Sequence, residues 1–158
     1  MRQALGLRDV EVFAIPRGLL RDTQSALQAA GSESNECFVL WTGQRSKRGE
    51  IQVRSIYVPR QVATTHERGL SITVDGAELQ RLNVEWLHRG EQLVAQVHSH
   101  PTAPFHSPTD DRYAIVTIEG GLSIVAPLFG FCAMQDLRSC AIFRLWDGEW
   151  GWVPPRDA

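Results

Sequence analysis

The chain has 158 residues, of which 43% are apolar and 22% charged; this is the size and composition of one globular domain with its own core. The formal net charge is −2, so electrostatics does not favour a nucleic acid or an anionic membrane as partner. No apolar run approaches the ~20 residues of a membrane-spanning helix, and residues 1–16 lack the apolar core of a signal peptide. We therefore expect one cytoplasmic domain over residues 1–158.

The first half of the chain contains one predicted helix and two predicted strands. Residues 16–30 place leucines at helical spacing, and Gly31 is the expected stop. Residues 37–43 form a short apolar run that predicts a buried strand. Residues 51–59 alternate apolar and polar side chains and predict a second strand, joined to the first by a charged turn.

The second half continues the mixture of helices and strands. Residues 76–89 predict a helix with Leu79, Leu82 and Trp86 on one face. Residues 91–98 predict a strand, residues 122–134 one or two strands, and residues 140–153 a hairpin around an Asp-Gly turn. Because there is no regular β-α-β alternation, the pattern indicates an α+β sheet protein.

Cysteines and tryptophans are expected to be structural. Cys37, Cys132 and Cys140 are odd in number and form no closely spaced pair, which argues against a disulfide framework and a cysteine-ligated zinc site. Any metal ligands should then be nitrogen and oxygen.

Trp150 and Trp152 share one face of the last predicted strand; they either pack on the sheet, which we favour, or form a partner surface.

Residues 97–112, VHSHPTAPFHSPTDDR, hold three of the five histidines in the chain. His98 and His100 are two apart at the end of a predicted strand, so their imidazoles point to the same side. This spacing can place two nitrogens on one cation. Pro101 then ends the strand just beyond the second histidine.

A short helix is predicted to begin directly after this cluster. Ser107 is a favoured N-cap, Pro108 a favoured first residue, and Asp110 the third helical residue, which turns its side chain back toward the histidines. Two imidazoles and one carboxylate leave a fourth position for water, the pattern of a catalytic zinc site. The alternative is a polar loop that binds no metal. We would favour it for a His-x-His motif alone, but not for a strand, His-x-His, Pro101, the Ser107–Pro108 helix start and Asp110 in succession. His106 is interpreted as a loop residue or an outer partner of the site.

HSHP followed by SPTD resembles the signature of the JAMM metalloproteases, also called MPN+ domains. That signature has a glutamate far upstream, then His-x-His-Pro, then Ser-x-x-Asp, and NECFVLWTG supplies Glu36 as the glutamate. The resemblance extends from about Glu36 through residues 122–130 and is strongest to the bacterial JAB-type subgroup. It implies a single-domain, MPN-like (cytidine-deaminase-like) α+β fold, with a curved mixed β-sheet flanked by helices.

The resemblance also implies roles for individual residues. His98, His100 and Asp110 resemble the ligands of one zinc ion per chain. Glu36 resembles the general base that takes a proton from metal-bound water. Ser107 resembles the serine that helps to hold the oxyanion.

Two assignments have competitors. The usual family spacing from the second histidine lands on Asp111, whereas the Ser-x-x-Asp register lands on Asp110; we expect Asp110 and keep Asp111 as the alternative. Glu33 lies three residues before Glu36. The start of the strand and the distance to Gly43 favour Glu36.

The implied activity is that of a deubiquitinase-like isopeptidase, which hydrolyses the amide bond after the C-terminal glycine of a ubiquitin-like protein. Expected partners are the tail of that protein, its conjugates, and E1-like and E2-like enzymes of a bacterial conjugation operon, several of which have antiviral roles. Neither a nucleic acid nor a membrane is expected as a partner. Three alternatives remain: a noncatalytic MPN scaffold, a binding module with a structural metal, and release of a small group from a sulfur-carrier protein.

Overall fold

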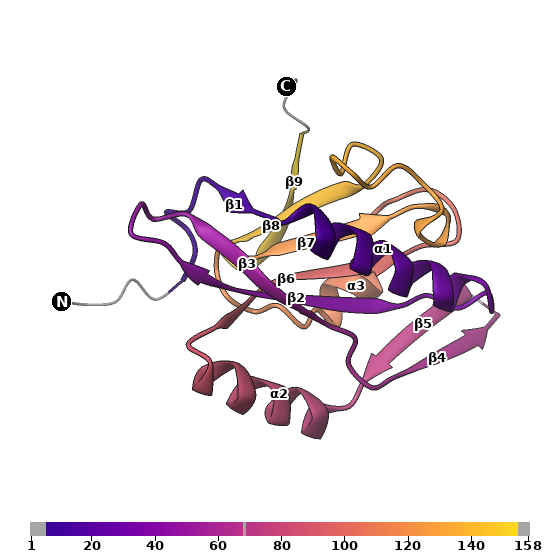
Figure 1. Ribbon diagram of the computed structural model, residues 1–158. Coiled ribbons are helices and arrows are strands. Elements are labelled where there is room, and N and C mark those ends of the chain that lie inside the picture. Colours follow the sequence, from indigo (N-terminus) through magenta and orange to yellow (C-terminus); the bar gives the residue numbers. More distant parts are fainter. Residues whose placement is uncertain (1–5, 68, 155–158) are drawn as a thin grey trace.

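The computed structural model describes residues 6–67 and 69–154 and shows a mixed β-sheet with helices on both faces (Figure 1). The helices are α1 (Arg17–Gly31), α2 (Gly76–His88) and α3 (Pro108–Arg112), and η1 (Leu128–Gly130) is a short 3-10 turn. The strands are β1 (Phe13–Ala14), β2 (Phe38–Arg45), β3 (Ile51–Tyr57), β4 (Gln61–His66), β5 (Gly69–Val74), β6 (Gln92–Ser99), β7 (Leu122–Ala126), β8 (Ala141–Trp146) and β9 (Glu149–Val153).

The main sheet has the strand order β1-β3-β2-β6-β7-β8-β9. β6 and β7 at its centre are parallel, as are β1 and β3, and the other neighbours are antiparallel. β4 and β5 form a separate hairpin that projects beyond the end of β2 and β6 (Figure 1). The α+β class and the curved mixed sheet expected from the sequence are confirmed.

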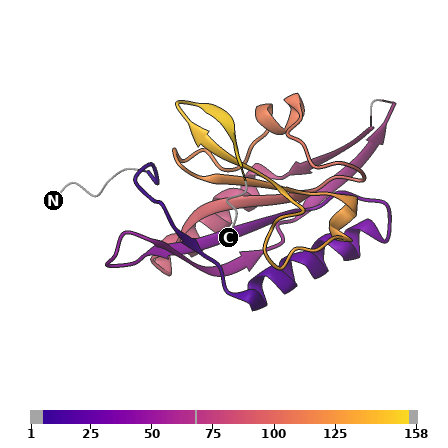
Figure 2. The same cartoon turned by 90° about the horizontal axis from the view of Figure 1, so that it is seen from above.

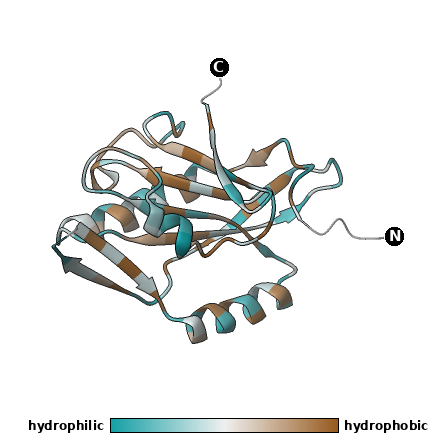
Figure 3. Ribbon diagram, turned by 180° about the vertical axis from the view of Figure 1, so that it is seen from behind, coloured by the Kyte–Doolittle hydropathy of each residue, from teal (hydrophilic) through white to brown (hydrophobic). Residues whose placement is uncertain are grey.

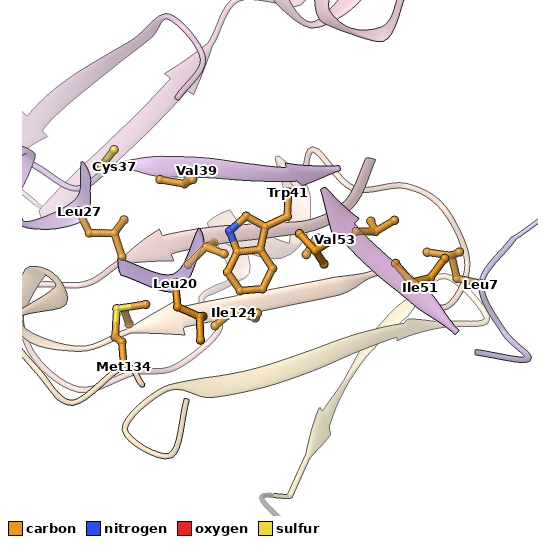
Figure 4. Close-up of a cluster of buried hydrophobic side chains, with 14 of the residues drawn as sticks. Leu7, Leu20, Leu27, Cys37, Val39, Trp41, Ile51, Val53, Ile124 and Met134 are labelled. Carbon is orange, nitrogen blue, oxygen red and sulfur yellow. The ribbon is translucent and has the colours of Figure 1, made fainter. Parts of the chain in front are cut away.

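The larger core lies between α1 and the sheet. α1 crosses one face of the sheet and α3 lies on the other, toward which the β8–β9 end of the sheet curls (Figure 2). Trp41 of β2 is fully buried among the aliphatic side chains of this core (Figure 4), and its indole N–H donates to Thr23 Oγ1 on α1 at 2.9 Å. This bond satisfies the polar atom that burial of a tryptophan brings into a core.

A smaller core anchors α2 to the opposite face. Side chains alternate along a strand, so Leu40 points away from its neighbour Trp41 and packs against Leu82 and Trp86 of α2. Asp75 caps this helix by accepting the Ala77 N–H at 3.2 Å. Hydrophilic and hydrophobic residues alternate along the α2 ribbon (Figure 3), as in an amphipathic surface helix.

Most of the predicted elements are present, and the structure adds detail to them. Gly31 is the last residue of α1 rather than the residue after it; a side chain there would collide with Phe129. Residues 122–134 contain one strand, β7, followed by η1. The β4–β5 hairpin was not predicted; β4 is mostly polar, whereas β5 alternates apolar and polar residues.

The hairpin predicted at the C-terminal end forms β8 and β9. Asp147 and Gly148 both have positive φ angles, 53° and 78°, as the expected two-residue turn requires. Trp150 is half-buried, as predicted, but Trp152 is 61% exposed, so only one of the two packs as expected. No helix in the described part of the chain is long and apolar enough to cross a membrane.

Candidate metal centre

The two histidines of the site extend from the end of β6. His98 lies in the strand opposite Phe38, and its ring centroid is 5.0 Å from that phenyl ring. His100 follows the strand but remains tied to the sheet, because its N–H donates to the Ala126 carbonyl and its own carbonyl accepts the Phe129 N–H. Both imidazoles are buried, at 1% and 4% exposure. Their orientation is therefore set by the backbone of the two parallel strands.

α3 brings a carboxylate to these histidines. Ser107 caps the helix by accepting the Asp110 N–H at 3.1 Å, and the Asp110 carboxylate accepts the Ser107 N–H at 2.7 Å. This reciprocal capping box turns Asp110 back toward the helix start, as predicted. One Asp110 oxygen lies 3.3 Å from His98 Nε2 and the other 3.4 Å from His100 Nε2.

These three side chains fit a metal ion. One ligand atom from each of His98, His100 and Asp110 lies within 4.8 Å of the others. Both ring nitrogens of His98 and Nδ1 of His100 are buried without a hydrogen-bond partner among the described residues. Because buried polar atoms are almost always satisfied, such orphaned nitrogens indicate a missing ligand. Two imidazoles and a carboxylate are a donor set that suits zinc.

The charge states also suit a cation. Burial lowers the pKa of His98, despite the opposing effect of the nearby Asp110 carboxylate, and so favours the neutral imidazole that binds metals. Burial alone would raise the pKa of Asp110, but the adjacent His100 and His98 outweigh it, and the net shift is downward. The site therefore offers the neutral imidazole of His98 and the carboxylate anion of Asp110.

Glu36 lies on the loop that enters β2 and faces the same cavity. Burial raises its pKa to about 7, and the neighbouring Asp110 adds to this, whereas His100 opposes it. Glu33, its competitor in the sequence, is exposed and lies three residues further from the strand.

The cavity has a volume of about 310 Å³. One wall is formed by the residues predicted to form the site: Glu36, His98, His100, Ser107 and Asp110. The opposite wall was missed in the sequence; it is the β4–β5 hairpin, which contributes His66, Gly69, Leu70, Ser71 and Ile72. The alternation of Leu70, Ile72 and Val74 was the available signal, but it does not say that the hairpin folds over the histidines.

Asp111 does not approach His98 or His100. It belongs to a second polar pair, in which its Oδ1 lies 2.5 Å from Nδ1 of His106. His106, interpreted from the sequence as a loop residue or outer partner, is almost fully buried, with 4% of its side chain exposed.

None of the three cysteines is among the residues that line the cavity, and their surroundings make them poor nucleophiles. Burial raises the pKa of Cys37 to about 11 and that of Cys140 to about 12, and it also raises the pKa of Cys132. A thiol must ionise to react, so these surroundings disfavour thiolate chemistry near neutral pH. Cys37 is buried as expected, whereas Cys132 is only partly buried.

Known proteins share this sequence pattern and fold. The family described as prokaryotic homologs of the JAB domain matches residues 22–143. A protein of Sinorhizobium fredii (strain NBRC 101917 / NGR234), named probable metalloprotease y4jG, is 37% identical over 147 residues, covering 92% of this chain and 88% of that protein. The solution structure of a protein from Salinibacter ruber (strain DSM 13855) superposes with a TM-score of 0.56 at 15% identity, covering 90% of this chain and 88% of that one.

Proposed function

The chain belongs to the prokaryotic homologues of the JAB domain, and from that premise we propose that it is a zinc-dependent isopeptidase acting on a ubiquitin-like protein. The proposed reaction is hydrolysis of the amide bond after the C-terminal glycine of that protein. The observation that carries the proposal is the convergence of His98, His100 and Asp110 with Glu36 on one cavity. The name of the Sinorhizobium relative, a probable metalloprotease, supports peptide hydrolysis.

In this proposal His98, His100 and Asp110 would hold one zinc ion. Bound zinc polarises a carbonyl and lowers the pKa of water toward ~7. The three side chains are held by β6 and α3 before any metal binds, so ligand geometry is largely preorganised.

Glu36 is the proposed proton carrier. With a pKa raised to about 7, its carboxyl group can both accept and release a proton near neutral pH. It takes a proton from the attacking water and passes it to the departing amine. An ordinary exposed glutamate would be too weak a base for the first step.

Ser107 is the proposed donor to the carbonyl oxygen. Its Oγ accepts the Asp110 N–H, and a serine hydroxyl that accepts one hydrogen bond still has its own O–H to donate. A donor held in place by a helix cap needs little reorganisation as negative charge develops on the substrate oxygen.

The cavity suits a slim, extended tail. β5 pairs only with β4 among the described strands, so its outer backbone edge can accept an incoming strand. Ile72 on this hairpin and Phe105 on the loop before α3 both line the cavity. A tail that ends in glycine brings no side chain for this cavity to accommodate. We further propose that the protein acts in the cytoplasm and is encoded in a conjugation operon with E1-like and E2-like enzymes.

Cleavage of a fusion between a bacterial ubiquitin-like protein and a reporter tests this function. Glu36→Gln should retain zinc and the fold but lose about 10²-fold or more of the rate, as expected for a lost general base. Glu33→Gln is the matched control and should cleave normally, because Glu33 is exposed outside the cavity. Equal rates in Glu36→Gln and the wild type would refute the assignment.

The same assay separates metal from thiol chemistry. A strong zinc chelator should stop cleavage and added zinc should restore it, whereas alkylation of Cys37, Cys132 and Cys140 should leave the rate unchanged. Cleavage that survives the chelator and fails after alkylation would identify a cysteine protease instead.

A further inference from the structure

α3 carries the carboxylate of the metal centre, yet hydrophobic packing does not hold it in place. It has five residues, none of them buried. Its hydrophilic character is visible in Figure 3, where the short helix in front of the sheet is coloured teal. So short a helix has little intrinsic stability, so other contacts must fix its position.

The residue before the cap provides such contacts. His106 lies within hydrogen-bond distance on both sides of its ring, with Nδ1 2.5 Å from Asp111 Oδ1 and Nε2 3.0 Å from Ser123 Oγ on β7. The ring packs between Phe143 of β8 and Trp150 of β9, at centroid distances of 4.8 Å and 5.3 Å. It thus connects α3 to the sheet and to the C-terminal hairpin.

The segment after α3 is tied to the same point. Gln96 of β6 accepts the backbone N–H groups of Ile115 and Val116 at 2.7 Å and 2.9 Å, which fixes the orientation of its amide. The other end of that amide donates to Ser123 Oγ at 3.1 Å. Both ends of the segment that contains α3 are therefore bound to one buried Gln96–Ser123 pair.

The donors and acceptors around His106 indicate which of its ring nitrogens carries the proton. The Asp111 carboxylate can only accept, so Nδ1 of His106 carries a proton that points at Asp111. The Ser123 hydroxyl, which accepts from Gln96, can then donate its own proton to His106 Nε2. The sequence Asp–His–Ser has the order of a hydrolytic triad, but Ser123 is completely buried and cannot reach a substrate. Asp111, His106 and Ser123 can therefore position α3, but they cannot carry out nucleophilic attack.

We propose that His106 and Asp111 are positioning residues that lock α3 against the sheet and thereby hold Asp110 and Ser107 beside the two histidines. The adjacent aspartates then have separate tasks, because Asp110 faces the histidines while Asp111 orients His106. The inference rests on the proposed function for the identity of the metal, but its test does not depend on cleavage of any substrate.

The experiment measures zinc affinity by competition with a chromophoric chelator. Asp111→Ala should weaken zinc binding by about 10- to 100-fold, the usual effect of removing a group that orients a ligand. Asp111→Asn, which keeps an acceptor for the ring N–H, should retain most of the affinity. Arg112→Ala is the control on the same helix, and should bind zinc like the wild type. His106→Gln tests the other partner and should match Asp111→Ala.

Amide hydrogen exchange in the metal-free protein provides a readout that involves no zinc. The amides of Asp110 and Asp111 are hydrogen bonded to Ser107, and both should exchange faster in Asp111→Ala, while β6 amides are unchanged.

Unaltered zinc affinity and unaltered exchange in Asp111→Ala would overturn the proposal. The proposal would also be overturned if Asp111→Ala lost zinc completely while Asp110→Asn retained it, because Asp111 would then be the metal ligand. Normal zinc behaviour without cleavage of ubiquitin-like fusions would instead count against the proposed function alone.

Discussion

Glu36 shows at the scale of a single residue how burial beside the candidate metal site affects stability. Burial raises its pKa to about 7 from 4.5, so folding favours the protonated carboxyl. That contribution is fully present below about pH 4.5 and is lost as the pH rises through about 7. The folded protein therefore tolerates a neutral Glu36 better than a charged one.

A neutral replacement should reveal this dependence in the metal-free protein. Glu36→Gln should melt at a higher temperature than the wild type at pH 8 and at the same temperature at pH 4, because only at pH 8 must the wild type hold a desolvated charge. Thermal unfolding followed by circular dichroism measures this. Glu33→Gln, at an exposed site, should show no such difference. A stabilising effect that is equal at both pH values would contradict the assigned pKa shift.

The Ser107 hydroxyl caps α3 and, in the proposed function, also donates to the substrate carbonyl oxygen. Ser107→Ala should lower the free energy of unfolding by about 1 kcal/mol through the lost helix cap. It should also lower the cleavage rate by about 10²- to 10³-fold through the lost donor. Ser107→Thr keeps both an acceptor and a donor, and should retain most of the stability and activity. Cleavage by Ser107→Ala at the wild-type rate would remove Ser107 from the mechanism.

At the scale of elements, the β4–β5 hairpin forms the wall of the cavity that faces the metal site. Ile72 of β5 lines this cavity, whereas Val62 of β4 is 65% exposed and lies outside it. Ile72→Lys should raise KM for a ubiquitin-like fusion by about tenfold or more, with little change in zinc affinity. Val62→Lys is the matched control on the neighbouring strand. Equal KM values for both variants would show that the substrate does not contact this hairpin.

At the scale of the whole molecule, metal binding should stabilise the fold. A ligand that binds only the folded state at 100 times its Kd adds about 2.7 kcal/mol to the free energy of unfolding. For a domain of this size that raises Tm by roughly 5 to 10 °C. Differential scanning calorimetry with and without zinc should show the rise in the wild type and not in His98→Ala. His88→Ala, which changes an exposed histidine on α2, should respond like the wild type.

Features encoded in short stretches were predictable from the sequence. The strand that ends in His98 and His100, the Ser107–Pro108 helix start and the Asp147–Gly148 turn each depend on neighbouring residues alone. Alternation along a strand and the geometry of a helix cap are local rules, so they hold wherever the element lies in the fold. For this reason the sequence indicated the two histidines and the aspartate that turns back toward them.

Only the tertiary structure decided how distant segments meet. Glu36 lies more than sixty positions before the histidines in the chain, and its elevated pKa arises from burial beside them. The β4–β5 hairpin and the contact between His106 and the C-terminal hairpin likewise depend on strand pairing across the molecule. The sequence left Asp110 and Asp111 as competitors, because one residue of helix rotation separates them. In the folded protein Asp111 pairs with His106, whereas Asp110 faces His98 and His100.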